Sequence, residues 1–251
     1  MRKIVLFLGF FGLICFSCIA QQDGLGTWNI WNMRYIFNEK WSIFGEGQVR
    51  SLKFYHHFHY HEYKGGLTYE AYPMLRLTLA AGKYDTYREG GNFIRPKNSD
   101  EIRLWTQMVI LQRLGVFRIE HRYRTEMRFT TKGYRNRFRY RTEVSMPLGK
   151  TSISQRVQLG MSNEIFFTDV PPYFERNRFS LAISYRWSPQ VLMQLGYLHQ
   201  FDYRINDEIG RDFLQIACYL TLSKKLSSFP ISNEQRFGEQ GEQSKDNEPT
   251  P

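Results

Sequence analysis

Apolar and polar residues alternate along much of the chain between residues 21 and 223. The alternation is clearest in residues 117–129 and 134–146, where apolar or aromatic residues take every second position and arginine or glutamate takes the others. Successive side chains of a β-strand point to opposite faces, so each segment is predicted to be a strand with one apolar and one charged face. Similar alternation marks 75–81, 101–110, 152–162, 178–187 and 214–222 and, less regularly, 27–37, 41–52 and 57–71.

The length of these strands favours a membrane barrel. They are longer than the roughly 5–6 residues usual in globular sheets and suit a tilted crossing of a bilayer. Aromatic residues make up 16% of the chain, and many lie near predicted strand ends, as in interfacial girdles. An open sheet edge would leave backbone groups unpaired in hydrocarbon. We therefore predict an all-β transmembrane antiparallel barrel of about 10–12 strands. An exported soluble β-sandwich binding module is the alternative architecture.

Turn residues divide the predicted strands. Short turns are expected at 38–40, 72–74, 113–115, 147–150 and 188–190, and longer links at 89–100, 167–175 and 203–210. This pattern predicts short periplasmic turns and longer outer loops. With the stretch between the turn at 188–190 and the link at 203–210, we count eleven segments, whereas a barrel with both termini in the periplasm has an even number. Either residues 203–210 hide a further hairpin or the strand at 27–37 is misassigned.

The two ends of the chain differ from the middle. Residues 1–20 combine Arg2 and Lys3, an apolar run and small residues at a cleavage site, which predicts a secretory signal peptide. Residues 21–223 are predicted to form the barrel, and the polar residues 224–251 a disordered tail. Export predicts an outer-membrane location, with the lipid bilayer and lipopolysaccharide as surroundings. The net charge of +10 is then not the footprint of a nucleic-acid-binding protein, and small anions are the partners to consider.

In a barrel, the charged faces point into the lumen. We call the predicted lumen residues the charge network; they are Glu101, Arg103, Arg118, Glu120, Arg122, Arg124, Glu126, Arg128, Arg135, Arg137, Arg139, Arg141, Glu143 and Arg156. Arginine outnumbers glutamate in this set. Two interpretations remain open: the network fills and plugs a narrow barrel, or it lines a narrow anion-preferring channel or binding site. No cofactor is expected.

Ion pairs between neighbouring strands follow from the expected registers. Across the turn at 130–133, Glu126 is predicted to face Arg139, and Arg122 to face Glu143. Across the turn at 113–115, Glu101 is predicted to lie beside Arg128, and Arg103 beside Glu126. Opposed unlike charges would stabilise each strand pair by a fraction of a kcal/mol, on the order of 0.2–1 kcal/mol.

Histidines raise two further possibilities. His57, His59 and His61 are weak candidates for a metal site, but alternate residues of a strand lie too far apart for one tetrahedral ion without a bend. Some membrane barrels hydrolyse or transfer acyl chains with a serine or histidine. His121, His199, Ser51 and Ser162 are candidates for such chemistry, yet no motif joins them and His121 lies on the predicted lipid face. We expect no enzyme, with a lipid-modifying enzyme as the alternative. The segment 88–100, with Gly90 and Gly91, is expected to be an ordinary exposed loop.

Several segments carry a family resemblance. They are TWNIWNMRY, WSIFGEGQVRSLKFY, FHYHEYKGGLTY, REGGNFIRPKNSDEIRLWTQ and IEHRYRTEMRF with NRFRYR. Together they resemble domain of unknown function 2490, a family of uncharacterised exported proteins of Gram-negative bacteria, over about Thr27 to Leu222. The resemblance implies an outer-membrane protein, and it implies no catalytic residue.

Overall fold

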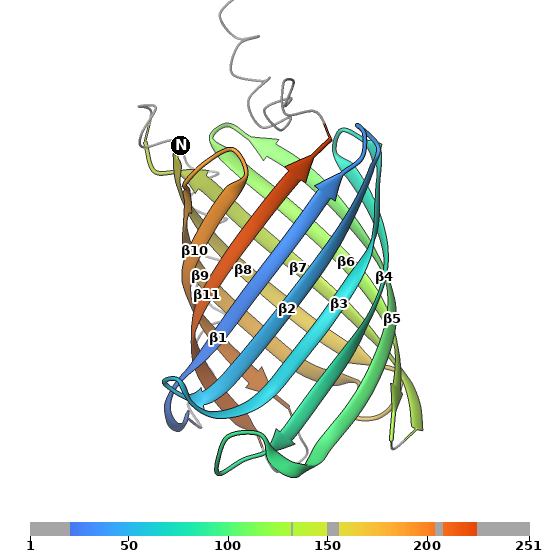
Figure 1. Ribbon diagram of the computed structural model, residues 1–251, viewed down its shortest axis with the longest axis vertical. Helices are drawn as coiled ribbons and strands as arrows, with labels where there is room; N and C mark the ends of the chain where they lie inside the picture. The colour runs from blue at the N-terminus through green and yellow to red at the C-terminus, as the bar shows by residue number, and fades with distance from the viewer. Residues whose placement is uncertain (1–20, 132, 150–155, 204–207, 225–251) are drawn as a thin grey trace, which may run out of the picture.

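Eleven β-strands form one closed sheet in the described part of the chain (Figure 1). The computed structural model describes residues 21–131, 133–149, 156–203 and 208–224. The predicted signal peptide and nearly all of the predicted tail therefore lie outside the described residues. The strands are β1 (Gln21–Ile36), β2 (Trp41–Lys53), β3 (His56–Tyr72), β4 (Leu75–Arg88), β5 (Ile94–Leu114), β6 (Phe117–Thr130), β7 (Gly133–Pro147), β8 (Val157–Thr168), β9 (Phe174–Arg186), β10 (Val191–Asp202) and β11 (Ile209–Ser223). Within these ranges no helix is long and apolar enough to cross a membrane.

The barrel closes through a parallel pair of strands. Each strand pairs antiparallel with the next along the chain, whereas β1 and β11 run in the same direction, from Gln21 opposite Gly210 to Ile36 opposite Ser223. An odd number of up-and-down strands makes the first and last strands run the same way, so closure must be parallel. The expected even number of strands is wrong for the described residues, which form eleven. The segment at 27–37 is not misassigned, since it falls in β1 up to Ile36. The closed sheet also excludes the two-sheet sandwich.

The links between strands lie at two rims. We name them from Figure 1: among the described residues, the upper rim carries 37–40, 73–74, 115–116, 148–149, 156 and 187–190, and the lower rim carries 54–55, 89–93, 131, 169–173, 203 and 208. Among the links whose residues are all described, those at the upper rim have two to four residues, and 89–93 and 169–173 at the lower rim have five, as predicted; the lower-rim link at 54–55 has only two. Residues 94–100 are not loop but the start of β5, with Ser99 opposite Thr86. Pro96 and the polar residues around it had suggested a loop.

The outer face of the barrel is apolar around its circumference. Exposed aliphatic side chains include Met33, Leu67, Leu79, Leu104, Ile183 and Leu195, from six different strands. Exposed aromatic side chains lie toward both rims, with Phe117 and Tyr185 near the upper rim and Phe54, Phe129 and Tyr173 near the lower rim. The alternation that predicted the strands therefore places their apolar faces outward.

Facing residues of neighbouring strands pack closely at two places on the inner face of the barrel, between β3 and β4 and between β9 and β10. Gly66 of β3 and Ala80 of β4 are opposite residues that face the lumen, and a Cβ atom at Gly66 would overlap the Ala80 side chain and the Leu79 carbonyl oxygen. Gly196 approaches Ala182 in a similar way between β10 and β9. The glycines leave room for the facing alanine and for the neighbouring carbonyl oxygen of the adjacent strand.

Candidate functional site: the arginine-rich lumen

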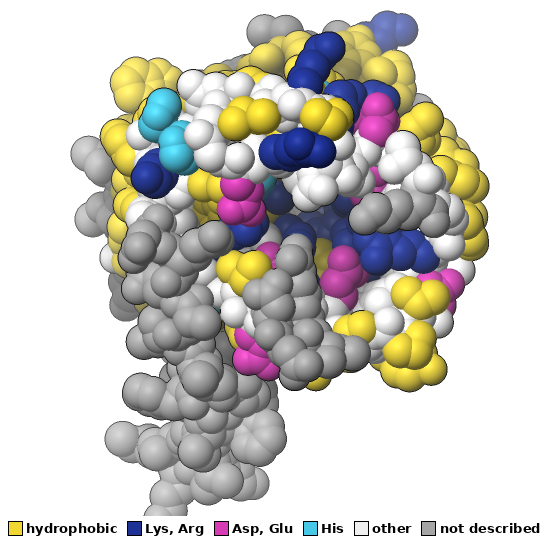
Figure 2. Space-filling view, turned by 90° about the horizontal axis from the view of Figure 1, so that it is seen from below, with side chains coloured by type: hydrophobic (Ala, Val, Ile, Leu, Met, Phe, Trp, Pro, Cys, Tyr) yellow, Lys and Arg dark blue, Asp and Glu magenta, His cyan; other side chains and the backbone are white. Residues whose placement is uncertain are grey.

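A large cavity occupies the lumen. Its volume is about 3110 Å³, and its lining includes residues from both rims, among them Asn38 and Ser188 at the upper rim and Glu89 and Pro172 at the lower rim. Figure 2 looks into the barrel from the lower rim and shows basic side chains around the central hollow, with hydrophobic side chains around the outside. The chain therefore encloses a polar cavity that extends along the barrel.

The cavity lining is strongly basic. Among the described residues that line it, Lys and Arg outnumber Asp and Glu by 21 to 11. Most of these charges come from β5 to β9, because every second residue of those strands points inward and arginine recurs at that period. The lumen therefore carries a net positive charge that its own acidic groups do not balance.

Glu126 of β6 is the most deeply buried acid of this wall, with none of its surface exposed. Four arginines surround its carboxylate: Arg139 at 2.6 Å, Arg137 at 3.6 Å, and Arg103 and Arg124 each at 3.7 Å. A buried carboxylate is stable only when it is paired in this way. Glu126 thus holds together guanidinium groups from three neighbouring strands.

Other carboxylates repeat this arrangement along the wall. Glu164 binds Arg122 at 2.6 Å and Arg139 at 2.8 Å. Glu175 accepts from both Nε and Nη2 of Arg137 and lies 3.4 Å from Arg128 of β6. These contacts link β6, β7, β8 and β9 across the lumen, and each carboxylate contacts at least two arginines.

Aromatic rings support several of the guanidinium groups. The central carbon of Arg124 lies 3.9 Å from the ring centre of Trp105, and Arg103 lies 3.8 Å from Tyr84. Arg139 and Arg178 both lie over Phe166, at 4.6 and 4.7 Å. The face of an aromatic ring attracts a cation, so the rings hold arginines in place without neutralising them.

The predicted registers are wrong by two residues, although most of the predicted ion pairs form. Glu126 lies opposite Arg137, and Arg122 lies opposite Arg141. Arg103 lies opposite Arg128.

The predicted ion pairs that do form join diagonal neighbours on adjacent strands, not directly opposed residues. Arg139 still reaches Glu126, Arg128 still bonds Glu101, and Arg103 lies 3.7 Å from Glu126. Arg122 instead bonds Glu164, while Glu143 lies opposite Glu120 and contacts Arg141 at 3.1 Å. Diagonal neighbours remain within reach of long side chains, so a contact can form without direct opposition.

The cavity brings the predicted charge network together. Thirteen of its members line the cavity, and Glu126 is buried among them; the thirteen are Glu101, Arg103, Arg118, Glu120, Arg122, Arg124, Arg128, Arg135, Arg137, Arg139, Arg141, Glu143 and Arg156. Residues that the sequence analysis left out of the network belong to the same wall: Arg50, Glu62, Lys64, Glu164, Glu175, Arg176, Arg178 and Asp202. Glu175 had been placed in a loop, and Glu164 beyond the end of a strand. Extending the alternation by two residues would have found Glu164. It would not have found Glu175, which is out of phase with Arg178 and lies at a register shift between β8 and β9.

The histidines of β3 do not converge. His59 lines the cavity, whereas His61 contacts Tyr87 at 3.1 Å and lies 3.6 Å from Asp85. His57 is near the lower rim with a positive φ of 57°. Within the described ranges, no group of three or more His, Cys, Asp or Glu residues could hold a metal ion.

The residues considered for lipid chemistry are also dispersed. Ser162 hydrogen-bonds to Ser180 in the lumen, and Ser51 to Thr27. On the outer face, His121 bonds Tyr140 at 2.8 Å. His199 bonds Asp212 at 2.7 Å on another part of the barrel. In the described part of the chain, neither serine hydrogen-bonds to a histidine.

Comparison with known proteins gives a family and no activity. None of the curated proteins matches this sequence. A family model described as "Protein of unknown function (DUF2490)" matches residues 25–210, which is most of the chain, and the protein therefore belongs to the DUF2490 family.

Proposed function

We propose that this protein is an outer-membrane β-barrel whose arginine-rich lumen binds small anions and lets them pass between its two rims. One observation carries the proposal: a closed barrel that is apolar on its outside surrounds a basic cavity lined by residues of both rims. The predicted signal peptide at residues 1–20 supports export.

The outer face supports membrane insertion. A soluble protein rarely exposes a contiguous apolar surface of more than a few hundred Å², whereas this barrel exposes large apolar side chains on all sides. A closed sheet is one of the two structures whose backbone hydrogen bonds are all satisfied within hydrocarbon. Aromatic side chains near both rims match the interfacial girdles of membrane barrels.

The lumen supports preference for anions. The excess of basic over acidic side chains among the described lining residues gives a positive potential inside a narrow space, and such a space concentrates counter-ions. Arginine presents several fixed donors to carboxylate or phosphate oxygens. A cavity of about 3110 Å³ also leaves space beyond the side chains, which favours a path over a plug.

Conductance in a planar lipid bilayer tests this function. The refolded protein should give steady conductance under a salt gradient, with a reversal potential on the anion-selective side. Arg124→Gln should reduce the anion preference, because Arg124 lines the cavity, and its guanidinium hydrogen-bonds the neutral Gln107 at 2.6 Å and lies farther, at 3.7 Å, from Glu126. The absence of conductance from protein shown to be folded and inserted would overturn the conducting role.

Lys83→Gln is the matched control. It removes the same charge from a lysine that pairs with Asp100 at 2.6 Å and does not line the cavity. Its selectivity should equal that of the unchanged protein. An equal loss of anion selectivity in Arg124→Gln and Lys83→Gln would mean that the net charge of the protein, and not the charge of the lumen, sets the anion selectivity.

A further inference from the structure

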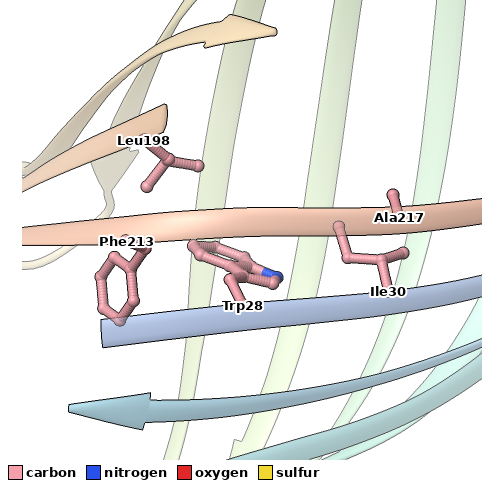
Figure 3. Packing of buried hydrophobic residues seen from close by; sticks show 5 residues of the cluster. All are labelled: Trp28, Ile30, Leu198, Phe213 and Ala217. Atoms are coloured by element: carbon pink, nitrogen blue, oxygen red, sulfur yellow. The ribbon is translucent and has the colours of Figure 1, made fainter. Parts of the chain in front are cut away.

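The lumen has an apolar side as well as a charged one. Trp28 and Ile30 of β1, Leu198 of β10, and Phe213 and Ala217 of β11 form a cluster of buried hydrophobic residues (Figure 3), which we call the apolar strip. Three of its members, Trp28, Ile30 and Leu198, line the cavity. The central inward positions of β1, β10 and β11 carry no charged residue; besides the strip they are Asn32, Gln194, Gly196, Gln200, Gln215 and Tyr219.

Guanidinium groups border the strip at Trp28. The central carbon of Arg50 lies 3.4 Å from the centre of the Trp28 ring, and that of Arg178 lies 4.8 Å from it. Arg178 reaches Trp28 from β9, so the two contacts bring charged and apolar walls together within the lumen. The Nε atom of Arg50 is buried without a hydrogen-bond partner among the described residues.

The acids near these arginines neutralise them only in part. Arg50 pairs with Glu62 at 3.1 Å, but the Glu62 carboxylate also binds Lys64 at 2.6 Å. Arg178 bonds Gln200 at 2.9 Å, and its nearest carboxylate oxygen, on Glu164, is 3.8 Å away. Glu164 itself already binds two other arginines. Arg178 also lies within the repulsive fields of Arg176 and Arg50. An added anion would relieve this repulsion.

We infer that the lumen binds amphipathic anions, in which a carboxylate or phosphate head is joined to an apolar chain or ring. The head lies at Arg50 and Arg178, and the apolar part lies along Trp28, Ile30 and Leu198. Charge complementarity selects the head, and the uncharged stretch of β1, β10 and β11 selects the tail. This inference rests on the proposed function only in needing a lumen that solutes can enter.

Equilibrium dialysis of radiolabelled octanoate against the folded protein in phosphatidylcholine nanodiscs tests the inference, with empty nanodiscs giving the background. Octanoate should bind saturably. Unlabelled acetate should compete more weakly by about tenfold or more, because burying even two methylene groups corresponds to about tenfold in affinity. Octanol, which has the tail without the charge, should also compete more weakly.

Two pairs of variants separate head from tail. Arg178→Gln should weaken octanoate binding by about tenfold, whereas Arg186→Gln, on the same strand and also in the cavity lining, should change it less than about twofold. Leu198→Ser should weaken binding, and Val109→Ser, an apolar lumen residue of β5 outside the strip, should not. Folding of each variant is checked by circular dichroism.

The outcomes also separate this inference from the proposed function. Equal competition by acetate and octanoate, or no binding above empty nanodiscs, would overturn the amphipathic site even if the barrel conducts anions. Saturable octanoate binding by a barrel without conductance would support the site and overturn the conducting role.

Discussion

Glu126 lies directly opposite Arg137 in the β6–β7 ladder, yet its shortest ion pair, 2.6 Å, is with Arg139, two residues farther along the strand. The arginine side chain is long enough to reach a diagonal neighbour, and Glu126 thereby contacts arginines from both adjacent strands. A single buried carboxylate therefore offsets the repulsion of several cations. This relationship makes Glu126 the most sensitive acid of the lumen wall.

Replacing Glu126 with glutamine should destabilise the barrel by about 3 kcal/mol, because removing one member of a buried ion cluster leaves its partners uncompensated. Glu143→Gln should cost no more than about 1 kcal/mol, since the Glu143 side chain is 33% exposed and its partner Arg141 also binds Glu120. Unfolding in urea, followed by tryptophan fluorescence in phosphatidylcholine vesicles, measures both. Equal stability of the two variants would contradict the central position of Glu126.

Paired cysteines should reveal the register of β6 and β7. With the native cysteines replaced by serine, Thr125→Cys with Phe138→Cys should form a disulfide, because these residues are directly opposite each other. Thr125→Cys with Tyr140→Cys, the pair expected from the sequence-based register, should crosslink far less because its members are offset by two residues. Mobility on a non-reducing gel reports both. Preferential crosslinking of the second pair would restore the predicted register.

The close approach of β3 and β4 predicts intolerance of a side chain at Gly66. Gly66→Val should destabilise the barrel by about 1–3 kcal/mol, because the added atoms would overlap Ala80 and the Leu79 carbonyl. Gly45→Val is the control, since a Cβ atom at Gly45 meets nothing within 4 Å. The urea midpoints of the two variants make the comparison. A stable Gly66→Val protein would mean that the two strands lie farther apart.

The apolar outer belt predicts a position-dependent cost for charge. Leu79 is 62% exposed and lies opposite Leu67 within the belt, whereas Leu114 is 63% exposed and ends β5 at the upper rim. In a membrane, Leu79→Arg should lower the free energy of unfolding by about 2–4 kcal/mol, and Leu114→Arg should lower it by about 0–1 kcal/mol. The folded fraction after insertion into vesicles measures the cost. If Leu79→Arg folded as well as Leu114→Arg, the belt would not be in contact with lipid.

Alternation was enough to predict the strands and their faces. In β6 and β7 the period of two is unbroken, so the inward set from Arg118 to Arg128 could be read directly from the sequence. The parallel pairing of β1 with β11 could not be predicted from the sequence, because it depends on the total number of strands and not on the residues of those two strands. The extent of β5 was hidden by Pro96, which suggested a loop although it lies in the strand arm near the lower rim.

The charge of the site could be predicted, but its exact contacts could not. Arginine at alternate positions predicted that the charged face of these strands points into the lumen. The two-residue register error shows that turn positions alone do not fix which residues pair across the strands. Contacts between distant strands, such as Arg128 with Glu175 or Arg178 with Trp28, depend on the curvature of the closed wall. The apolar strip was missed because its residues come from both ends of the chain.

The most direct test of the positive, accessible lumen is the chemical modification of a single cysteine at Ser162, again with the native cysteines replaced by serine. Ser162 lines the cavity and bonds only its neutral neighbour Ser180 among the described residues, so the replacement leaves the ion pairs intact. A negatively charged methanethiosulfonate reagent should react about tenfold or more faster than its positively charged analogue, because the lumen potential concentrates anions. Faster reaction of the positive reagent, or no reaction with either in the folded barrel, would contradict an open anion-attracting lumen.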